Sequence, residues 1–311
     1  MRRAFALVAL CLGALLAGGP SHAEGEPAVY LPVVALSRAP VSNRGAGATY
    51  AANSGYERCA AMAELGLGWY YNWGSDPGVC PGVESVPWIW NDAVPATLGG
   101  NSRWTGLGNE CANANQCNRT PQQMVDAWEI ALERFPGRKW VVANSYYYDW
   151  AQEFLTLAPR TPDAIGVHCY MTQFGPWEGC KDHILRYIGL ALNYGVPEVH
   201  ITEFGYVPTE GEGPERAIEW MGEMIEWFES QPMITRYAWF QLSYAGSESW
   251  AFGVHRNTSL VDFETGAVTP FGEAYRLTPL WADARADVNG DKRVDIADLV
   301  IVGKSFGKPV R

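Results

Sequence analysis

Residues 104–143 read WTGLGNECANANQCNRTPQQMVDAWEIALERFPGRKWVVA and contain the clearest strand–helix–strand unit of the chain. The first five and the last four of these residues are short apolar runs that predict strands. Between them, Thr120 suits an N-cap, Pro121 suits the first helical turn, and the Pro-Gly pair after Phe135 ends a helix. Strands that alternate with helices in this way are typical of a parallel sheet.

The same alternation extends on both sides of this unit. Further strands are predicted at 67–73, 83–90, 164–170, 198–204 and 236–241, and further helices at 184–193 and 214–230. The pattern therefore predicts an α/β fold of the (β/α)8 TIM-barrel type. Such a barrel needs one strand more, and the brief run 96–98 is the candidate for it.

The two ends of the chain differ in composition from the central region. Arg2 and Arg3, an apolar stretch and Ser21-His22-Ala23 form the pattern of a secretory signal peptide, so we expect an extracellular protein. An N-terminal anchor that is retained is the alternative. The expected organisation is a signal peptide at 1–23, a linker or entry segment at 24–48, a barrel domain at 49–277, a linker at 278–285 and a small C-terminal calcium-loop and helix unit at 286–311.

The composition excludes several classes of protein. Of the 311 residues, 48% are hydrophobic and 18% are charged, which excludes a disordered or fibrous chain. The formal net charge of -11 repels phosphate backbones, so we expect no nucleic-acid partner. The sequence also predicts no membrane span beyond the signal segment. The 14 Trp and 15 Tyr residues suit stacking on sugar rings or filling of the core.

The cysteines agree with an exported protein. Cys11 would leave with the signal peptide, and an even number then remains, which favours disulfides in an oxidising compartment. Proximity along the chain favours the pairs Cys59–Cys80, Cys111–Cys117 and Cys169–Cys180. A zinc site is the alternative, although the spacings contain no CxxC pair.

Two predicted strands end in a glutamate set among polar and aromatic residues. Glu110 follows Asn109 after the strand at 104–108, and Glu203 closes the strand at 198–204. In a parallel barrel both side chains lie at the C-terminal end, where the chemistry of such folds takes place. Glycoside hydrolysis needs one protonated and one charged carboxyl group. The pair is therefore the candidate catalytic site, and Asn109 is a candidate for binding a sugar hydroxyl.

Other strand ends supply side chains of the kind that line a sugar-binding site. Aromatic rings stack on the apolar C–H faces of sugars, and polar neighbours bind their hydroxyls. The expected substrate-binding residues are Asn109, Tyr71, Asn72, Trp73, Trp90, Tyr146, His168, Tyr170 and Trp239. The alternative for each aromatic cluster is that alternate members pack against the helices.

Six blocks of sequence also share their order and spacing with one known family. They are GWYYNW (68–73), VPWIW (86–90), GLGNE (106–110) followed by the helix start at 120–121, VHCY (167–170), ITEFG (201–205) and RYAWF (236–240). Over residues 50–277 the chain thus resembles glycoside hydrolase family 128, the Asl1-like glycosyl hydrolases. The resemblance implies a (β/α) barrel, retaining cleavage and activity on β-1,3-glucan. We expect a secreted, retaining endo-β-1,3-glucanase. The resemblance also implies that Glu110 is the acid/base and Glu203 the nucleophile.

The C-terminal unit has the spacing of a calcium loop. Oxygen ligands fall at Asp287, Asn289, Asp291, Asp295 and Asp298, and Arg293 would contribute its backbone carbonyl. We expect Ca²⁺ in a structural role here and no cofactor for catalysis. The unit resembles one half of a type I dockerin, which implies a cohesin-type or cell-surface partner. An acidic, solvated tail is the alternative.

Two other functions are compatible with parts of the sequence. A non-catalytic carbohydrate-binding or cell-surface module would need the aromatic residues, but it would not need both glutamates. A hydrolase of another β-glycan would need the same pair with different loops. A serine esterase is excluded because no Gly-x-Ser-x-Gly motif occurs.

Overall fold

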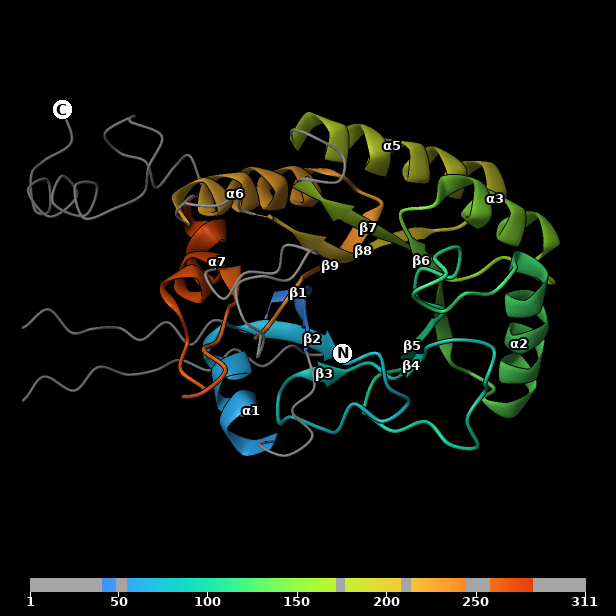
Figure 1. The fold of residues 1–311 in the computed structure, drawn as a ribbon, viewed down its shortest axis with the longest axis horizontal. Helices are drawn as coiled ribbons and strands as arrows, with labels where there is room; N and C mark the ends of the chain where they lie inside the picture. Colours follow the sequence, from blue (N-terminus) through green and yellow to red (C-terminus); the bar gives the residue numbers. More distant parts are fainter. Residues whose placement is uncertain (1–40, 49–54, 172–176, 208–213, 244–257, 282–311) are drawn as a thin grey trace, which may run out of the picture. The chain divides into compact units, whose positions relative to one another are not determined.

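The computed structural model describes residues 41–48, 55–171, 177–207, 214–243 and 258–281, in which strands alternate with helices (Figure 1). The strands are β1 (Val41–Gly47), β2 (Leu67–Tyr71), β3 (Glu84–Ser85), β4 (Trp88–Ile89), β5 (Trp104–Leu107), β6 (Lys139–Ser145), β7 (Ala164–Tyr170), β8 (Glu198–Gly205) and β9 (Ile234–Trp239). The helices are α1 (Gly55–Glu64), α2 (Pro121–Arg134), α3 (Tyr148–Leu157), α5 (Trp177–Tyr194), α6 (Glu215–Ser230) and α7 (Pro270–Trp281).

All strands of the sheet run parallel, in the order β3-β2-β1-β9-β8-β7-β6-β5-β4. The two outermost strands, β3 and β4, are consecutive pieces of the predicted strand 83–90. On one side of this segment the Val86 amide donates to the Tyr70 carbonyl, at 2.9 Å, and on the other the Gly108 amide donates to the Ile89 carbonyl, at 2.8 Å. The segment therefore joins both edges of the sheet, and the expected barrel is confirmed.

The prediction of the remaining strand was wrong. Residues 96–98 form no strand, and the missing strand is β1, which pairs with β2 and β9. The segment expected as a loose entry at 24–48 therefore contributes its last residues to the barrel. Strand β1 contains no apolar run, because there is no room for a side chain at Gly45. A Cβ at this position would lie 2.4 Å from the Trp69 ring. The buried Arg44 side chain donates instead to backbone carbonyls of α7.

The helix predicted in the quoted stretch is confirmed as α2. Thr120 caps it by a reciprocal pair of hydrogen bonds, in which the Gln123 amide donates to Thr120 Oγ1 and the Thr120 amide donates to Gln123 Oε1. Helix α5 begins before the predicted range 184–193, and α6 agrees with the prediction. Helix α7 continues to Trp281, so the linker expected at 278–285 begins within a helix.

The buried aromatic side chains form two separate clusters, one inside the barrel and one in the outer core. The cluster inside the barrel contains Trp69, Tyr71, Trp88 and Trp104. A larger cluster lies between the sheet and the surrounding helices. Full burial of each such ring stabilises the fold by roughly 1.5–3 kcal/mol. The inside of the barrel is therefore filled, and its chemistry is confined to the strand ends.

The disulfide pairing expected from proximity is confirmed. Cys59–Cys80, Cys111–Cys117 and Cys169–Cys180 are all bonded. The alternative of a zinc site on these cysteines is therefore wrong. The Cys111–Cys117 bond closes the loop that follows β5, and Cys169–Cys180 joins β7 to α5.

The predicted signal peptide and the predicted calcium ligands between Asp287 and Asp298 lie outside the described residues. The helices within the described residues include no candidate for a membrane span.

Candidate active site

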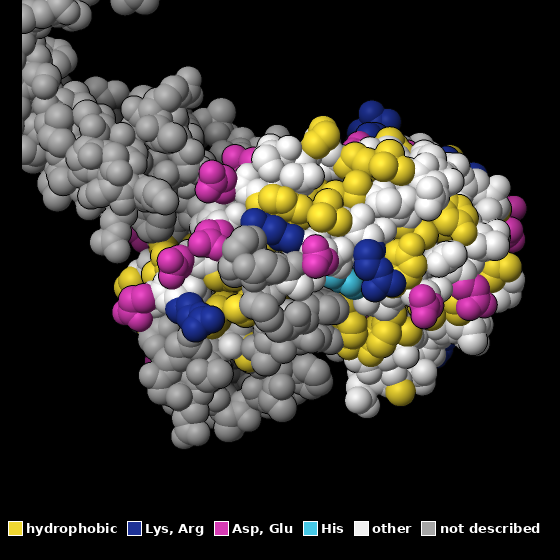
Figure 2. Space-filling model, turned by 90° about the horizontal axis from the view of Figure 1, so that it is seen from above, with side chains coloured by type: hydrophobic (Ala, Val, Ile, Leu, Met, Phe, Trp, Pro, Cys, Tyr) yellow, Lys and Arg dark blue, Asp and Glu magenta, His cyan; other side chains and the backbone are white. Residues whose placement is uncertain are grey.

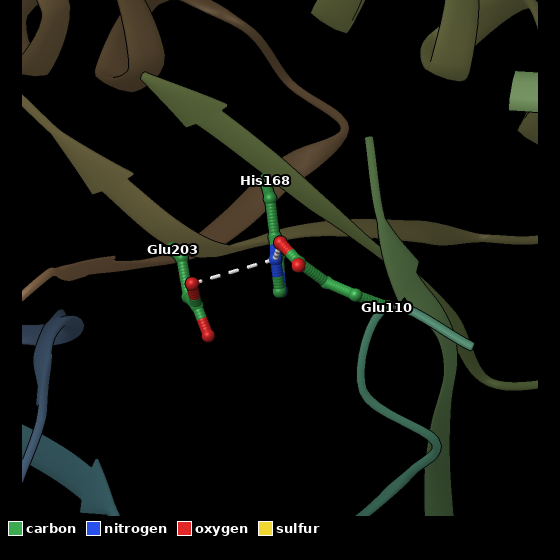
Figure 3. Close-up of side chains that lie close together, drawn as sticks. All are labelled: Glu110, His168 and Glu203. Carbon is green, nitrogen blue, oxygen red and sulfur yellow. Dashed lines mark hydrogen bonds and ion pairs between the residues drawn. The ribbon is translucent and has the colours of Figure 1, made fainter. Parts of the chain in front are cut away.

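Three buried ionisable side chains meet at the C-terminal ends of three strands. Glu110 follows β5, His168 lies on β7 and Glu203 lies on β8, and Figure 3 shows all three pointing toward one another. None is more than 7% exposed. Buried charges are costly unless they are paired and hydrogen-bonded, so the contacts among these groups decide what the site can do.

One ring nitrogen of His168 contacts both carboxyl groups. Nδ1 lies 2.8 Å from Oε1 of Glu110 and 3.4 Å from Oε2 of Glu203. With both carboxyls ionised, Nδ1 must carry the hydrogen, because carboxylate oxygens only accept. Burial lowers the pKa of His168, but the Glu203 charge and the Glu110 hydrogen bond outweigh it, so the pKa is raised above its usual value.

A bulge in β8 brings Glu203 to this place. Val199 and Ile201 pack in the outer core, and strict alternation would send Glu203 the same way. The pairing of Ile201 with Tyr237 and of Phe204 with Trp239 leaves one extra residue on β8. That residue breaks the alternation, and Glu203 lies inside the barrel opposite His168.

Glu203 accepts hydrogen bonds from two further side chains. Trp73 Nε1 donates to Oε1 at 3.0 Å, and the Tyr170 hydroxyl donates to Oε2. Burial raises the pKa of Glu203 above its usual value, the His168 imidazole opposes this shift, and the Glu110 carboxyl adds to it. The Tyr170 and Trp73 donors also lower the Glu203 pKa and favour its ionised form.

The backbone around Glu110 is held by the neighbouring strand. Glu110 has a φ of 48°, and its amide donates to the Asn144 carbonyl at 2.8 Å. The Asn144 side chain in turn donates to the Leu107 and Gly108 carbonyls. A non-glycine residue at positive φ persists only where its surroundings enforce it. Here the Asn144 contacts and the Cys111–Cys117 bond supply that constraint.

A family model described as a glycosyl hydrolase catalytic core matches residues 47–275. The chain belongs to this family. The match extends from the end of β1 into α7 and includes both buried glutamates, so the protein is a glycoside hydrolase. No curated protein sequence matches the hydrolase.

Solved structures with the same fold are enzymes of glycoside hydrolase family 128. A subgroup I endo-β-1,3-glucanase from Amycolatopsis mediterranei, in complex with laminaritriose, is 21% identical, with 76% of this chain and 99% of that chain covered and a TM-score of 0.59. A subgroup II endo-β-1,3-glucanase from Sorangium cellulosum is 17% identical, with 76% and 98% covered and a TM-score of 0.61. A subgroup III curdlan-specific exo-β-1,3-glucanase from Blastomyces gilchristii, in complex with glucose, is 23% identical, with 76% and 99% covered and a TM-score of 0.57. These likenesses show that the hydrolase shares the family 128 fold.

The structure brings several of the predicted binding residues of the hydrolase to the pair. Trp73 and Tyr170 contact Glu203 directly. Tyr71 lies beneath the site, fully buried, and its hydroxyl donates to the Thr202 carbonyl at 2.6 Å. Burial, with the charges of Glu203 and Glu110, raises the Tyr71 pKa far above its usual value, so this hydroxyl stays protonated.

Four other predicted residues lie on the segments that directly follow strands β2, β4, β5 and β6. Asn109 is 3% exposed beside Glu110, and its Nδ2 lies 3.5 Å from Gln116 Oε1. Asn72 uses its side-chain oxygen to accept from the Gly74 amide, and Trp90 is half-buried. Tyr146 is also half-buried, on the loop after β6.

Trp239 lies elsewhere than expected. Its neighbour on β9, Ala238, faces the barrel interior, so Trp239 faces the helices. Its indole is fully buried and donates to the Thr258 carbonyl at 2.8 Å. The side chain is therefore a core residue and is not available to a sugar ring.

Phe240 belongs to the site and was missed by the sequence analysis. Its half-buried ring lies 5.6 Å from that of Trp73 and 5.7 Å from that of Tyr170, edge to face in both cases. Side chains alternate between the two faces of a strand, so Ala238 and Phe240 lie on one face and Trp239 on the other. This alternation could have identified Phe240 from the sequence.

Among the residues that the structure describes, one group of side chains could hold a metal ion. It consists of Glu110, His168 and Glu203. One ligand atom from each lies within 4.8 Å of the others. The same closeness is what the hydrolytic chemistry of paired carboxyls requires.

Proposed function

We propose that this glycoside hydrolase is a secreted, retaining endo-β-1,3-glucanase. The observation that carries the proposal is the closeness of the carboxyl groups of Glu110 and Glu203, whose nearest ligand atoms lie within 4.8 Å. Retaining enzymes hold these groups about 5–5.5 Å apart, and inverting enzymes about 6.5–9.5 Å apart to admit a water molecule.

In the first step Glu203 acts as the nucleophile. One of its carboxylate oxygens attacks the anomeric carbon, and the bond from that carbon to the leaving oxygen breaks. Glu110 gives its proton to the leaving oxygen. Since the Nδ1–H of His168 bonds Oε1 of Glu110, the proton that is transferred belongs on Oε2.

In the second step a water molecule attacks the anomeric carbon of the glycosyl–Glu203 ester. Glu110, now ionised, takes a proton from that water, and the bond from the sugar to Glu203 breaks. The Tyr170 and Trp73 donors stabilise the carboxylate that is released. Two inversions at one carbon leave its configuration unchanged.

The substrate class is supported by the likeness to family 128 and by the aromatic residues around the pair. The similar solved enzymes are endo- and exo-acting β-1,3-glucanases. Trp73, Tyr170 and Phe240 form an aromatic wall beside Glu203, which suits the apolar face of a pyranose. Secretion is supported by the three disulfides together with the signal-like residues 1–23.

The decisive experiment measures reducing-sugar release from linear β-1,3-glucan, mixed-linkage glucan, xylan and mannan, with the anomer of the first product followed by NMR. We expect activity on β-1,3-glucan, an initial β-anomer, and a mixture of oligosaccharides from internal cleavage. An initial α-anomer would exclude retention. Release of glucose alone would show exo action.

Two variants assign the roles within the pair. Glu203→Ala should abolish turnover with the fold intact. Glu110→Ala should also lower turnover of glucan, by about 10²–10⁴-fold, yet retain activity on aryl glycosides whose leaving group needs no proton. Glycan binding by the unchanged protein without any turnover would favour a carbohydrate-binding module instead.

For residues 286–311 we propose a calcium loop of the dockerin type. The regular spacing of oxygen-bearing side chains from Asp287 to Asp298 supports it. Calorimetric titration of the full chain with Ca²⁺ should show one site that Asp291→Ala removes. A cohesin-type partner should then bind the Ca²⁺-loaded chain and not the variant.

A further inference from the structure

Asn144 is a buried polar residue that takes no part in the two chemical steps above. It lies near the end of β6 and is 1% exposed. The surface in Figure 2 mixes charged, hydrophobic and uncharged side chains, and a substrate contacts only groups that are open to solvent in this way. Asn144 therefore affects the reaction only through the residues that it contacts.

The side-chain amide of Asn144 binds the end of β5. Its Nδ2 lies 3.0 Å from the Leu107 carbonyl and 3.2 Å from the carbonyls of Gly108 and Val141. Three acceptors around one atom require a donor, so the NH2 group lies there and Oδ1 points away from it. An aspartate would place a charged acceptor among the carbonyls. An amide therefore fits this place and a carboxylate does not.

The backbone of Asn144 binds Glu110 directly. The Glu110 amide donates to the Asn144 carbonyl at 2.8 Å. Between Val142 and Ser145, β6 carries one residue more than β7, and within this bulge Ala143 has a φ of 55°. Non-glycine residues at positive φ persist only where their contacts enforce them. The carbonyl and the side chain of one residue thus hold both the bulge and the backbone of the acid.

Gly166 on β7 makes room for the Asn144 side chain. A Cβ on Gly166 would lie 1.9 Å from Oδ1 of Asn144, which is closer than two such atoms can approach. Gly166 is two residues before His168, whose Nδ1 lies 2.8 Å from Oε1 of Glu110. Asn144 therefore packs against the strand that carries His168 and binds the segment that carries Glu110.

We propose that Asn144 is a positioning residue for proton donation by Glu110. Its side chain sets the end of β5 relative to β7, so that Oε1 of Glu110 stays on His168 and the transferable proton stays on Oε2. The inference rests on the proposed function, because that function makes Glu110 the acid. It predicts that loss of the Asn144 side chain impairs proton donation more than it impairs the attack by Glu203.

The test compares two substrates of Asn144→Ala. Cleavage of β-1,3-glucan needs a proton on the leaving oxygen, whereas a dinitrophenyl β-glycoside of laminaribiose has a leaving group that needs none. For both substrates kcat/KM reports the first step, in which the sugar is transferred to Glu203. We expect kcat/KM on glucan to fall about 10- to 100-fold and kcat/KM on the aryl glycoside to change less than about twofold.

Gly166→Ala tests the same contact from the other strand. Its Cβ would push the Asn144 amide away from the β5 carbonyls, so we expect the same difference between the two substrates. Adding Gly166→Ala to Asn144→Ala should cause no further loss, because the side-chain atoms that the Cβ meets are gone. If Asn144→Ala does not fold, Gly166→Ala carries the comparison.

The matched control is Asn101→Ala. Asn101 also holds backbone groups with its side-chain amide, since Oδ1 accepts from the Ser85 amide at 2.7 Å and Nδ2 donates to the Val83 carbonyl at 3.3 Å. It lies before β5, at the opposite end of that strand from Glu110. We expect the ratio of kcat/KM on the two substrates to stay unchanged in this variant.

Three results overturn the inference. Equal losses on both substrates would mean that Asn144 only stabilises the fold. Full activity on glucan would mean that Glu110 is held in place without the Asn144 side chain. The same difference between substrates in Asn101→Ala would mean that the effect is not specific to Asn144.

A measurement without turnover separates the inference from the proposed function. If the unchanged protein cleaves neither substrate, the proposed function fails, and NMR titration of His168 then decides the inference. Burial lowers the pKa of His168, while the Glu203 charge and the Glu110 hydrogen bond raise it. If Asn144 holds Glu110 against His168, this pKa should fall by about 1 pH unit in Asn144→Ala and stay constant in Asn101→Ala. An unchanged pKa in Asn144→Ala would overturn the inference.

Discussion

Nδ1 of His168 lies 2.8 Å from Oε1 of Glu110, and the same nitrogen is 3.4 Å from Glu203. One N–H group is therefore shared by the two carboxyls that the chemistry uses. This arrangement makes His168 a positioning residue, which sets the orientation and the charge of the pair without touching the bond that is cleaved.

Replacing His168 by Ala removes the shared donor. We expect kcat on β-1,3-glucan to fall roughly 10- to 100-fold, because a hydrogen bond to a charged group contributes about 1.5–3 kcal/mol. Two carboxyls without the donor also repel each other more, so the acid limb of the pH–rate profile should move to higher pH. His168→Asn, which offers an amide N–H, should recover part of both. An Ala variant with the original profile would contradict this role.

Removing a donor from Glu203 should raise its pKa. In Tyr170→Phe the carboxylate loses a hydrogen bond that favours its charged form, and turnover needs that charged form. We therefore expect the acid limb of kcat/KM to move up by about 1 pH unit. Tyr237→Phe is the matched control, because its hydroxyl bonds Glu229 at 2.7 Å in the outer core. A profile that shifts equally in both variants would contradict a specific effect.

The Cys111–Cys117 bond should matter more for activity than for stability. It closes a short loop, so the double Ser variant should lose only about 2 kcal/mol of unfolding free energy. The same loop carries Glu110 at positive φ, and kcat should fall at least tenfold. The double Ser variant of Cys59–Cys80, which closes a longer loop, should lose about 3 kcal/mol with kcat nearly unchanged. The opposite order would contradict the prediction.

Acid should destabilise the barrel through a buried histidine. His200 is 2% exposed, lies edge-on to Trp104, and burial lowers its pKa to about 4. The unfolded chain binds that proton near pH 6.5, so stability is lost as the pH falls from about 6.5 to 4, by about 3 kcal/mol at most. Urea unfolding at several pH values measures the loss. His200→Asn should flatten the dependence, although His183 contributes a similar slope.

Several features followed from residues that are close together in the chain. Thr120 and Gln123 determine where α2 begins, and the bounds of β7 agree with the predicted strand 164–170. The disulfide pairs join neighbours in the order of the cysteines, so proximity along the chain was sufficient. The glutamates were recognisable because each closes an apolar strand.

The tertiary structure decided the rest, because the deciding contacts join distant parts of the chain. Strand β1 contains Gly45 because the Trp69 ring lies across it, and a search for apolar runs misses such a strand. Glu203 faces inward only because β8 carries one more residue than β9 between Ile201 and Phe204. The sequence marked His168 as a ligand for sugar. Its position between two carboxyls depends on how three strands close around the barrel, which no local pattern encodes.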